Sequence, residues 1–346
     1  SDVCSSDLTY TFVYPSYRPT KILVFLKAWF TAAFLAPKHS IIVIQKIHTS
    51  RMYGRALKML VKLRQSRTIY DLDDAEHLRR PVDSLSYFLR HCNTVFAGSQ
   101  ALKSYVRQFN KQVHVLTSPV TDHCIKTSPR KEKLVVGWIG DFGNGHTTPY
   151  EFSHRRSLYE IFFPSLKLLD FPVKLVLMGI NQKKDIRLVL NYFSDHHNIE
   201  VDIPDNINWL DENDIYKRVS GFDIGVAPMT DHDFNRSKSA FKIKQYFSCG
   251  VPVLASNVGE NGLFVEEDVN GFFCETSLQF ADGIRYMHAV SNEQYLEFCK
   301  NALASRWKFS LENYCSAFFR CLLSEGSGYR EMTARITKNV KVLSPD

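Results

Sequence analysis

The sequence predicts an α/β protein built from two doubly wound domains. Three observations support this fold class. Short apolar runs alternate with helical patterns through most of the 346 residues, no tight hairpin signal joins consecutive runs, and a polar stretch separates two such series. Strands that alternate with helices form parallel sheets covered on both faces, so each series predicts one domain.

The first series contains strand candidates at 11–14, 41–44, 68–72, 94–97 and 113–116, with helical patterns at 55–65 and 101–109. The polar segments 117–121 and 126–133 are the expected linker. The second series has strand candidates at 134–139, 173–178, 199–201, 224–228, 253–256 and 272–274, with helical patterns at 156–169, 184–193, 212–219, 239–248 and 278–289. We therefore expect domains at 1–128 and 129–310, followed by a helix and basic tail at 311–346.

The composition limits the class of protein. The hydrophobic fraction of 45% suits a globular chain, and the net charge of +7 favours anionic partners. The basic residues look scattered and lack interleaved aromatics, which argues against nucleic acid. No Cys-x-x-Cys spacing predicts zinc among the 8 cysteines, and their apolar surroundings indicate reduced thiols in a cytoplasmic protein. The apolar stretch 22–37 predicts a buried or amphipathic helix, and peripheral contact with the inner face of a membrane is the alternative.

Glycines mark the expected binding domain. Only Gly54 and Gly98 precede the linker, and the other 14 of the 16 glycines follow it. The first cluster, Gly140, Gly143 and Gly145, follows the strand at 134–139. A strand that leads through glycines toward a helix exposes N–H groups that bind anions. The segment, with Asp141, predicts either a phosphate-binding loop or a tight turn at a domain start.

Four cations crowd the loop and helix that follow the strand at 224–228. They are Arg236, Lys238, Lys242 and Lys244. Cations oppose the dipole of a helix N-terminus, which is easiest to understand if an anion such as a diphosphate lies among them. Ser237 or Ser239 is expected to cap this helix. The alternative is a solvated basic face.

A third segment, 258–262, follows the strand at 253–256 at the same carboxyl edge of the sheet. It contains Gly259, Glu260 and Asn261. Its glycines would bring backbone N–H groups to a sugar or a phosphate. Two ordinary turns explain the segment equally well.

Residues 222–272 resemble the donor-site segment of retaining group-1 glycosyltransferases (family 4, GT-B fold). The matching residues are Gly250-Val-Pro-Val253 and Asn270-Gly271. The sequence departs from the family at both acidic positions, where it has Ser237 and Gln245. It is most similar to a subgroup with a Lys-x-x-x-Lys-x-x-Gln pattern, which Lys238, Lys242 and Gln245 match. The resemblance implies that Gln245 contacts the donor ribose, without the charge assistance of a Glu.

The first domain shows the same resemblance, which covers about residues 38–325. Asp71-Leu-Asp-Asp74 and the segment 96–102 resemble the strand ends of that subgroup. The resemblance implies that Asp73 or Asp74 orients an acceptor hydroxyl or takes its proton across a cleft between the domains. The alternative is that either residue caps the next helix.

The resemblance implies a retaining transfer from a nucleoside diphosphate sugar to a glycan, lipid or small-molecule acceptor, with no metal and no cofactor. Lys238, Lys242 and N–H groups near Gly140 and Gly143 would hold the diphosphate. The alternative is a degenerate nucleotide-sugar-binding protein without turnover, because both acidic positions have changed. Family members begin with a strand and a glycine loop, whereas the first glycine here is Gly54. We therefore expect that the natural N-terminus is missing.

Overall fold

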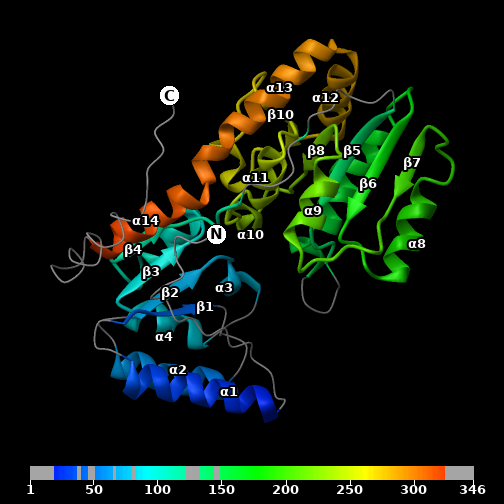
Figure 1. The fold of residues 1–346 in the computed structure, drawn as a ribbon. Helices are drawn as coiled ribbons and strands as arrows, with labels where there is room; N and C mark the ends of the chain where they lie inside the picture. The colour runs from blue at the N-terminus through cyan, green and yellow to red at the C-terminus, as the bar shows by residue number, and fades with distance from the viewer. Residues whose placement is uncertain are drawn as a thin grey trace. The chain divides into compact units, whose positions relative to one another are not determined.

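The structure is a computed structural model that describes residues 19–36, 40–45, 51–64, 68–79, 83–121, 126, 133–143 and 149–323. The chain divides into two compact units (Figure 1). Unit 1 comprises residues 1–98, 102–116 and 314–346, and unit 2 comprises residues 99–101 and 117–313. The C-terminal segment from residue 314 thus groups with the first unit.

Unit 1 contains a four-stranded parallel sheet in the order β1-β2-β3-β4. Its strands are β1 (Ile42–Gln45), β2 (Thr68–Leu72), β3 (Thr94–Ala97) and β4 (Val113–Val115). Its helices are α1 (Pro19–Phe30), the π-helix η1 (Thr31–Leu35), α2 (Arg51–Leu63), α3 (Glu76–Arg79), α4 (Asp83–His91) and α5 (Gln100–Val106). Helix α14 (Leu311–Leu323) packs Tyr314 and Phe318 against Ile69 and Phe96 of this sheet.

Unit 2 contains a six-stranded parallel sheet in the order β10-β9-β8-β5-β6-β7. Its strands are β5 (Leu134–Ile139), β6 (Val173–Met178), β7 (Ile199–Asp202), β8 (Ile224–Ala227), β9 (Val253–Ala255) and β10 (Gly271–Phe273). The strand order reverses between β5 and β8. In such sheets ligands bind outside the carboxyl ends of the strands at this reversal, which is called the switch point.

Helices and short helical segments connect the strands of unit 2. They are η3 (Tyr150–Phe152), α6 (His154–Ser157), the π-helix η4 (Leu158–Phe162), α7 (Phe163–Leu166), α8 (Lys183–Tyr192), α9 (Glu212–Val219), α10 (Asp233–Arg236), α11 (Phe241–Ser248), η5 (Gly259–Leu263), α12 (Ser277–Ala289), α13 (Asn292–Ala304) and η6 (Ser305–Phe309). Two apolar clusters pack against the sheet, and together they bury Trp138, Phe162, Phe222 and Tyr246.

Two interlocks of an aromatic ring with a glycine involve the central strands β5 and β8. A Cβ at Gly137 of β5 would lie 2.1 Å from the Phe222 ring, and one at Gly225 of β8 would lie 2.5 Å from the Tyr246 ring. The Tyr246 hydroxyl donates to the Val226 carbonyl at 3.0 Å and accepts from the Ile139 N–H at 3.2 Å. Tyr246 therefore ties α11 to both strands at the switch point.

Part of the expected linker is packed into unit 2. The Lys126 ammonium lies 2.9 Å from Asp223 Oδ1, and both side chains are almost fully buried. The other carboxylate oxygen of Asp223 accepts from the Val135 N–H at 2.9 Å. The two charges of this buried pair compensate each other, so removing either partner would leave an uncompensated charge in the interior.

The strands expected within the described residues match the structure closely, and no strand end differs by more than one residue. The strand expected at 11–14 and the tail lie outside the described residues, as do 127–132 of the linker. The helix expected at 156–169 is divided by the π-helix η4. The described cysteines are free, and burial raises the pKa of the Cys92 and Cys274 thiols to about 12. Within the described ranges no helix has the length and apolar character needed to cross a bilayer.

Candidate active site

The glycine loop after β5 is at the switch point of the unit 2 sheet. Gly140 follows β5 directly, and its N–H donates to the Met178 carbonyl at 3.0 Å. Asp141 Oδ1 accepts from the Gly143 N–H at 2.9 Å, which closes a tight turn. Gly143 has a left-handed φ of 90°, and a Cβ there would lie 2.9 Å from Ser153 Cβ. Gly145, the third glycine of the motif, lies outside the described residues.

The N-terminus of α11 lies beyond the other central strand, β8. We expected Ser237 or Ser239 to cap this helix, and that prediction is wrong. Ala240 occupies the N-cap in a left-handed conformation (φ 55°), and its side chain has no oxygen to accept from the first turn. Ser237 instead donates its hydroxyl to the Asp233 carbonyl at 3.0 Å. The first N–H groups of α11 thus have no side-chain cap, which suits an anion.

Lys242 in the first turn of α11 reaches the glycine loop. A Cβ at Gly140 would lie 2.7 Å from Lys242 Cε, so the glycine allows the lysine to cross the backbone at this point. The Lys242 Nζ is 2.8 Å from His154 Nε2 and 5.8 Å from the centroid of the Trp138 ring. If the ammonium donates to it, this imidazole nitrogen must be unprotonated. The structure thus brings Gly140, Lys242 and His154 together.

His154 was not singled out from the sequence. Its position in the first turn after a glycine loop was the available signal, because helix starts in doubly wound sheets face the ligand edge. Ser153 Oγ accepts from the Arg156 N–H at 3.3 Å and so caps the short helix α6. This cap fixes the start of the helix that carries His154.

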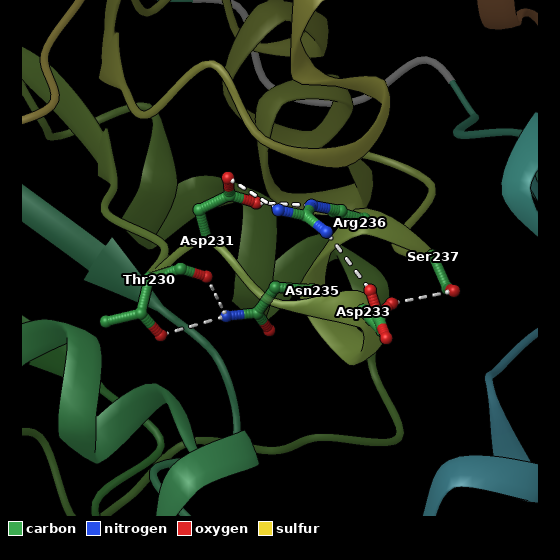
Figure 2. A network of polar contacts seen from close by, with 6 residues as sticks. All are labelled: Thr230, Asp231, Asp233, Asn235, Arg236 and Ser237. Carbon is green, nitrogen blue, oxygen red and sulfur yellow. Dashed lines mark hydrogen bonds and ion pairs between the residues drawn. The ribbon is translucent and has the colours of Figure 1, made fainter.

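The loop between β8 and α11 is held by its own polar network (Figure 2). Arg236 Nε and Nη2 donate to the two Asp231 oxygens at 2.7 and 3.0 Å, and Nη1 donates to Asp233 at 3.1 Å. Asn235 Nδ2 donates to the Thr230 carbonyl at 2.8 Å. Of the four cations in the basic cluster, Arg236 thus has its guanidinium paired with two carboxylates of the same loop.

Lys244 likewise does not join a solvent-facing cluster of cations. Its side chain is 0% exposed, and its ammonium donates to Thr117 Oγ1 and, at 2.8 Å, to the Ser118 carbonyl. Burial lowers the pKa of Lys244 to about 7, and the nearby Glu260 carboxylate opposes this shift. Lys244 therefore contributes to the interior of unit 2.

The loop after β9 packs on the loop that precedes α11. Gly259 has a φ of 64°, and a Cβ there would lie 2.7 Å from the Asn235 carbonyl oxygen. The Glu260 N–H donates to the Lys238 carbonyl at 3.1 Å, and its carboxylate accepts from the Gln100 N–H at 2.7 Å. Asn261 is 1% exposed and donates to the Ser256 carbonyl at 2.8 Å. These groups are thus engaged within the protein.

Lys238 and Gln245 lie beside the Lys242 cluster in sequence but contact other groups. The Lys238 Nζ lies 4.5 Å from the centroid of the Phe234 ring. Gln245 is half-buried on α11 and hydrogen-bonds the side chain of Tyr216 on α9. Tyr216 was not identified from the sequence, and its contact gives the Gln245 amide a fixed neighbour.

In unit 1, Asp73 and Asp74 follow the carboxyl end of β2. A Cβ at Gly98 would lie 3.1 Å from the Asp73 Cα, so the end of β3 passes close to this residue. The Asp74 carbonyl accepts from the Glu76 N–H at 2.8 Å where α3 begins. The side chains of Asp73 and Asp74 are half-buried. No group of three or more potential metal ligands occurs in the part of the chain that the structure describes.

Comparisons with known proteins concern the fold and the sequence family. Residues 153–289 match the family model of group 1 glycosyl transferases. No curated protein sequence matches the chain.

Several solved structures share its fold. The Anabaena protein HepE in complex with UDP-glucose has a TM-score of 0.62 at 18% identity, covering 89% of this chain and 84% of HepE. Sucrose-phosphate synthase from Thermosynechococcus elongatus gives 0.63 at 14% identity, with coverages of 91% and 79%. A glycosyltransferase from Rickettsia africae has a TM-score of 0.58 at 14% identity, covering 96% of this chain and 85% of that protein. The fold is therefore of the GT-B type, with two Rossmann-like domains. The matched segment and the fold together support a glycosyltransferase.

Proposed function

We propose that this protein transfers a sugar from a nucleoside diphosphate sugar, with the donor bound at the switch point of unit 2. The observation that carries the proposal is Lys242, which crosses Gly140 and meets His154 at the uncapped start of α11. Because HepE was solved with UDP and with UDP-glucose, uridine diphosphate sugars are the first donors to test.

The proposed site stabilises the leaving group. As the glycosidic C–O bond breaks, negative charge grows on the diphosphate oxygen that departs. The Lys242 ammonium and the N–H groups of the first turn of α11 would neutralise that charge. His154 acts on Lys242 by accepting its hydrogen bond, which fixes the direction of the ammonium.

The finer features of the proposal come from the family resemblance. We expect retention of the anomeric configuration, no requirement for metal or cofactor, and a glycan, lipid or small molecule as the acceptor. Asp73 or Asp74 would orient the acceptor hydroxyl or take its proton. Gln245 would contact the ribose, and Lys238, Gly143 and Asp141 would border the diphosphate.

The second candidate function is binding of a nucleotide sugar without turnover. The observations that favour it are Ser237 and Gln245, which replace the two acidic residues of the family pattern. Turnover separates the two candidates.

The test begins with a thermal-shift panel of nucleoside diphosphates and their sugars. We expect the nucleoside diphosphate with one particular base to raise the Tm of the wild type, and to raise the Tm of Lys242→Ala much less. Release of nucleoside diphosphate from the selected sugar is then measured with and without EDTA. Turnover that survives the chelator supports a metal-independent transferase, and binding without turnover supports the degenerate binder. A panel in which no nucleotide shifts the Tm would refute both functions.

A further inference from the structure

The positive charge of the chain is concentrated in one segment rather than scattered. Residues 8–70 contain 11 Lys and Arg residues and no Asp or Glu. The remaining residues contain 32 Lys and Arg against 36 Asp and Glu, since the whole chain has 43 and 36. Residues 8–70 therefore carry a formal charge of +11 and the rest carries −4, which accounts for the total of +7.

The same segment exposes large apolar side chains. On α1 and η1, Leu23 is 66% exposed, Leu26 51%, Phe30 52% and Phe34 57%. These residues are spaced by three or four positions, the repeat that places side chains on one face of a helix. Exposed apolar residues in a continuous row, as opposed to scattered single ones, indicate an interaction surface.

Helix α2 packs against α1 and adds exposed side chains of its own. It lies alongside α1 in unit 1 (Figure 1), where the Phe25 and Tyr53 rings meet at 4.5 Å and Trp29 Nε1 donates to the Ala56 carbonyl at 2.7 Å. Helix α2 also exposes apolar side chains: Met59 is 53% exposed and Leu63 is 48% exposed. We call the exposed side chains of α1, η1 and α2 the α1–α2 face.

Exposed cations accompany these apolar groups. Lys27 lies within the apolar row of α1, and Arg55 and Lys62 flank Met59 and Leu63 on α2. Apolar side chains inserted among lipid chains, with Lys and Arg beside the headgroups, are the pattern of helices that lie in a bilayer interface.

We propose that the α1–α2 face docks on the surface of an anionic lipid bilayer. The positive charge and the exposed apolar row of this face together favour an anionic bilayer over other partners. A second copy of the chain would bring two like-charged faces together, and a nucleic acid would leave the apolar row exposed. An anionic bilayer satisfies both features, because its headgroups attract the cations and its acyl region accepts Leu23, Phe30 and Phe34. The inference is independent of the transferase activity.

The test is flotation of the full chain with vesicles of phosphatidylcholine alone or with about one-third phosphatidylglycerol. We expect the wild type to float with the anionic vesicles and to float less as salt is raised. Leu23→Ser with Phe34→Ser removes apolar groups, and Arg55→Glu with Lys62→Glu reverses charges. Each pair should lower the partition coefficient at least about tenfold.

Matched controls carry the same changes on exposed residues of unit 2. They are Leu210→Ser with Leu278→Ser, and Lys184→Glu with Arg187→Glu. Unchanged flotation of these controls supports the proposal, provided that circular dichroism shows all variants folded. Three results would overturn it: a wild type that fails to float with anionic vesicles, equal losses in the controls, or an apolar variant that floats as well as the wild type. The last result would indicate simple attraction to polyanions.

Discussion

Two lysines on opposite faces of α11 show how position decides the role of the same side chain. Lys242 lies across Gly140 and contacts His154, whereas Lys244 is fully buried against Thr117 and Ser118. Two residues along a helix correspond to a rotation of about 200°, so these side chains diverge. One face of α11 carries Lys242 at the glycine loop, and the other face fixes the start of unit 2 through Lys244.

The comparison shows why a cluster of cations in a sequence overstates a binding site. Four basic residues stand within nine positions, but Arg236 is neutralised by Asp231 and Asp233 and Lys244 is an interior residue. Lys242, by contrast, lies next to Gly140 at the end of the central strand β5. The two faces can therefore be separated by substitution.

The largest expected effect is on folding. Lys244→Ala should lower the free energy of unfolding by about 2–5 kcal/mol, because it leaves a cavity and removes the donor to Thr117 Oγ1 and the Ser118 carbonyl. Urea denaturation measures this change. The exposed Lys184→Ala serves as the control and should shift the free energy by less than about 0.5 kcal/mol. Equal stability of the two variants would contradict a structural role for Lys244.

The next effect is on ligand affinity. Lys242→Ala should weaken binding of the nucleoside diphosphate by about 1–3 kcal/mol, the range for a hydrogen bond to a charged group. Its stability to urea should stay close to that of the wild type. Titration calorimetry measures the affinity. A variant that binds normally would remove Lys242 from the proposed site.

The buried face should also respond to pH. The pKa of Lys244 is about 7 in the folded protein and about 10.4 in an unfolded chain. Between these values the unfolded chain holds a proton that the folded protein lacks, so raising the pH favours the folded state. From pH 7 to 9 the wild type should gain up to about 2 kcal/mol of unfolding free energy relative to Lys244→Met. Parallel pH profiles of the two proteins would show that Lys244 stays protonated.

The smallest effect concerns His154. His154→Ala removes the acceptor for Lys242 and should reduce affinity for the nucleoside diphosphate by about 0.5–1.5 kcal/mol. Because His154 acts through Lys242, the double variant should lose little more than Lys242→Ala alone. Additive losses in calorimetry would mean that His154 contacts the ligand independently.

The fold was largely predictable because parallel strands bury both faces and form short continuous apolar runs. The strands 134–139 and 173–178 were located to the residue on this basis. The strand order, and hence the switch point between β5 and β8, depends on long-range pairing that local patterns do not encode. The π-helix η4 was not predicted, because the apolar pattern of residues 156–169 fits one continuous helix.

The candidate site was predictable only in part. A loop of glycines next to a basic helix start predicted Gly140 and Lys242, and the structure brings them together. The burial of Lys244 depends on Thr117 and Ser118, more than 120 residues away in the sequence. Likewise, the left-handed N-cap at Ala240 replaces the expected serine cap because Ser237 bonds back into α10.

The interlocks of Phe222 with Gly137 and of Tyr246 with Gly225 constrain how this chain can diverge in evolution. Any side chain at Gly137 or Gly225 would occupy the space of a ring. A larger residue at either glycine therefore requires a smaller residue in place of the ring. Either substitution made alone would leave the core badly packed, with a clash in one case and a cavity in the other. Each pair should vary together among related sequences, and positions 137, 222, 225 and 246 should drift more slowly than the exposed residues around them.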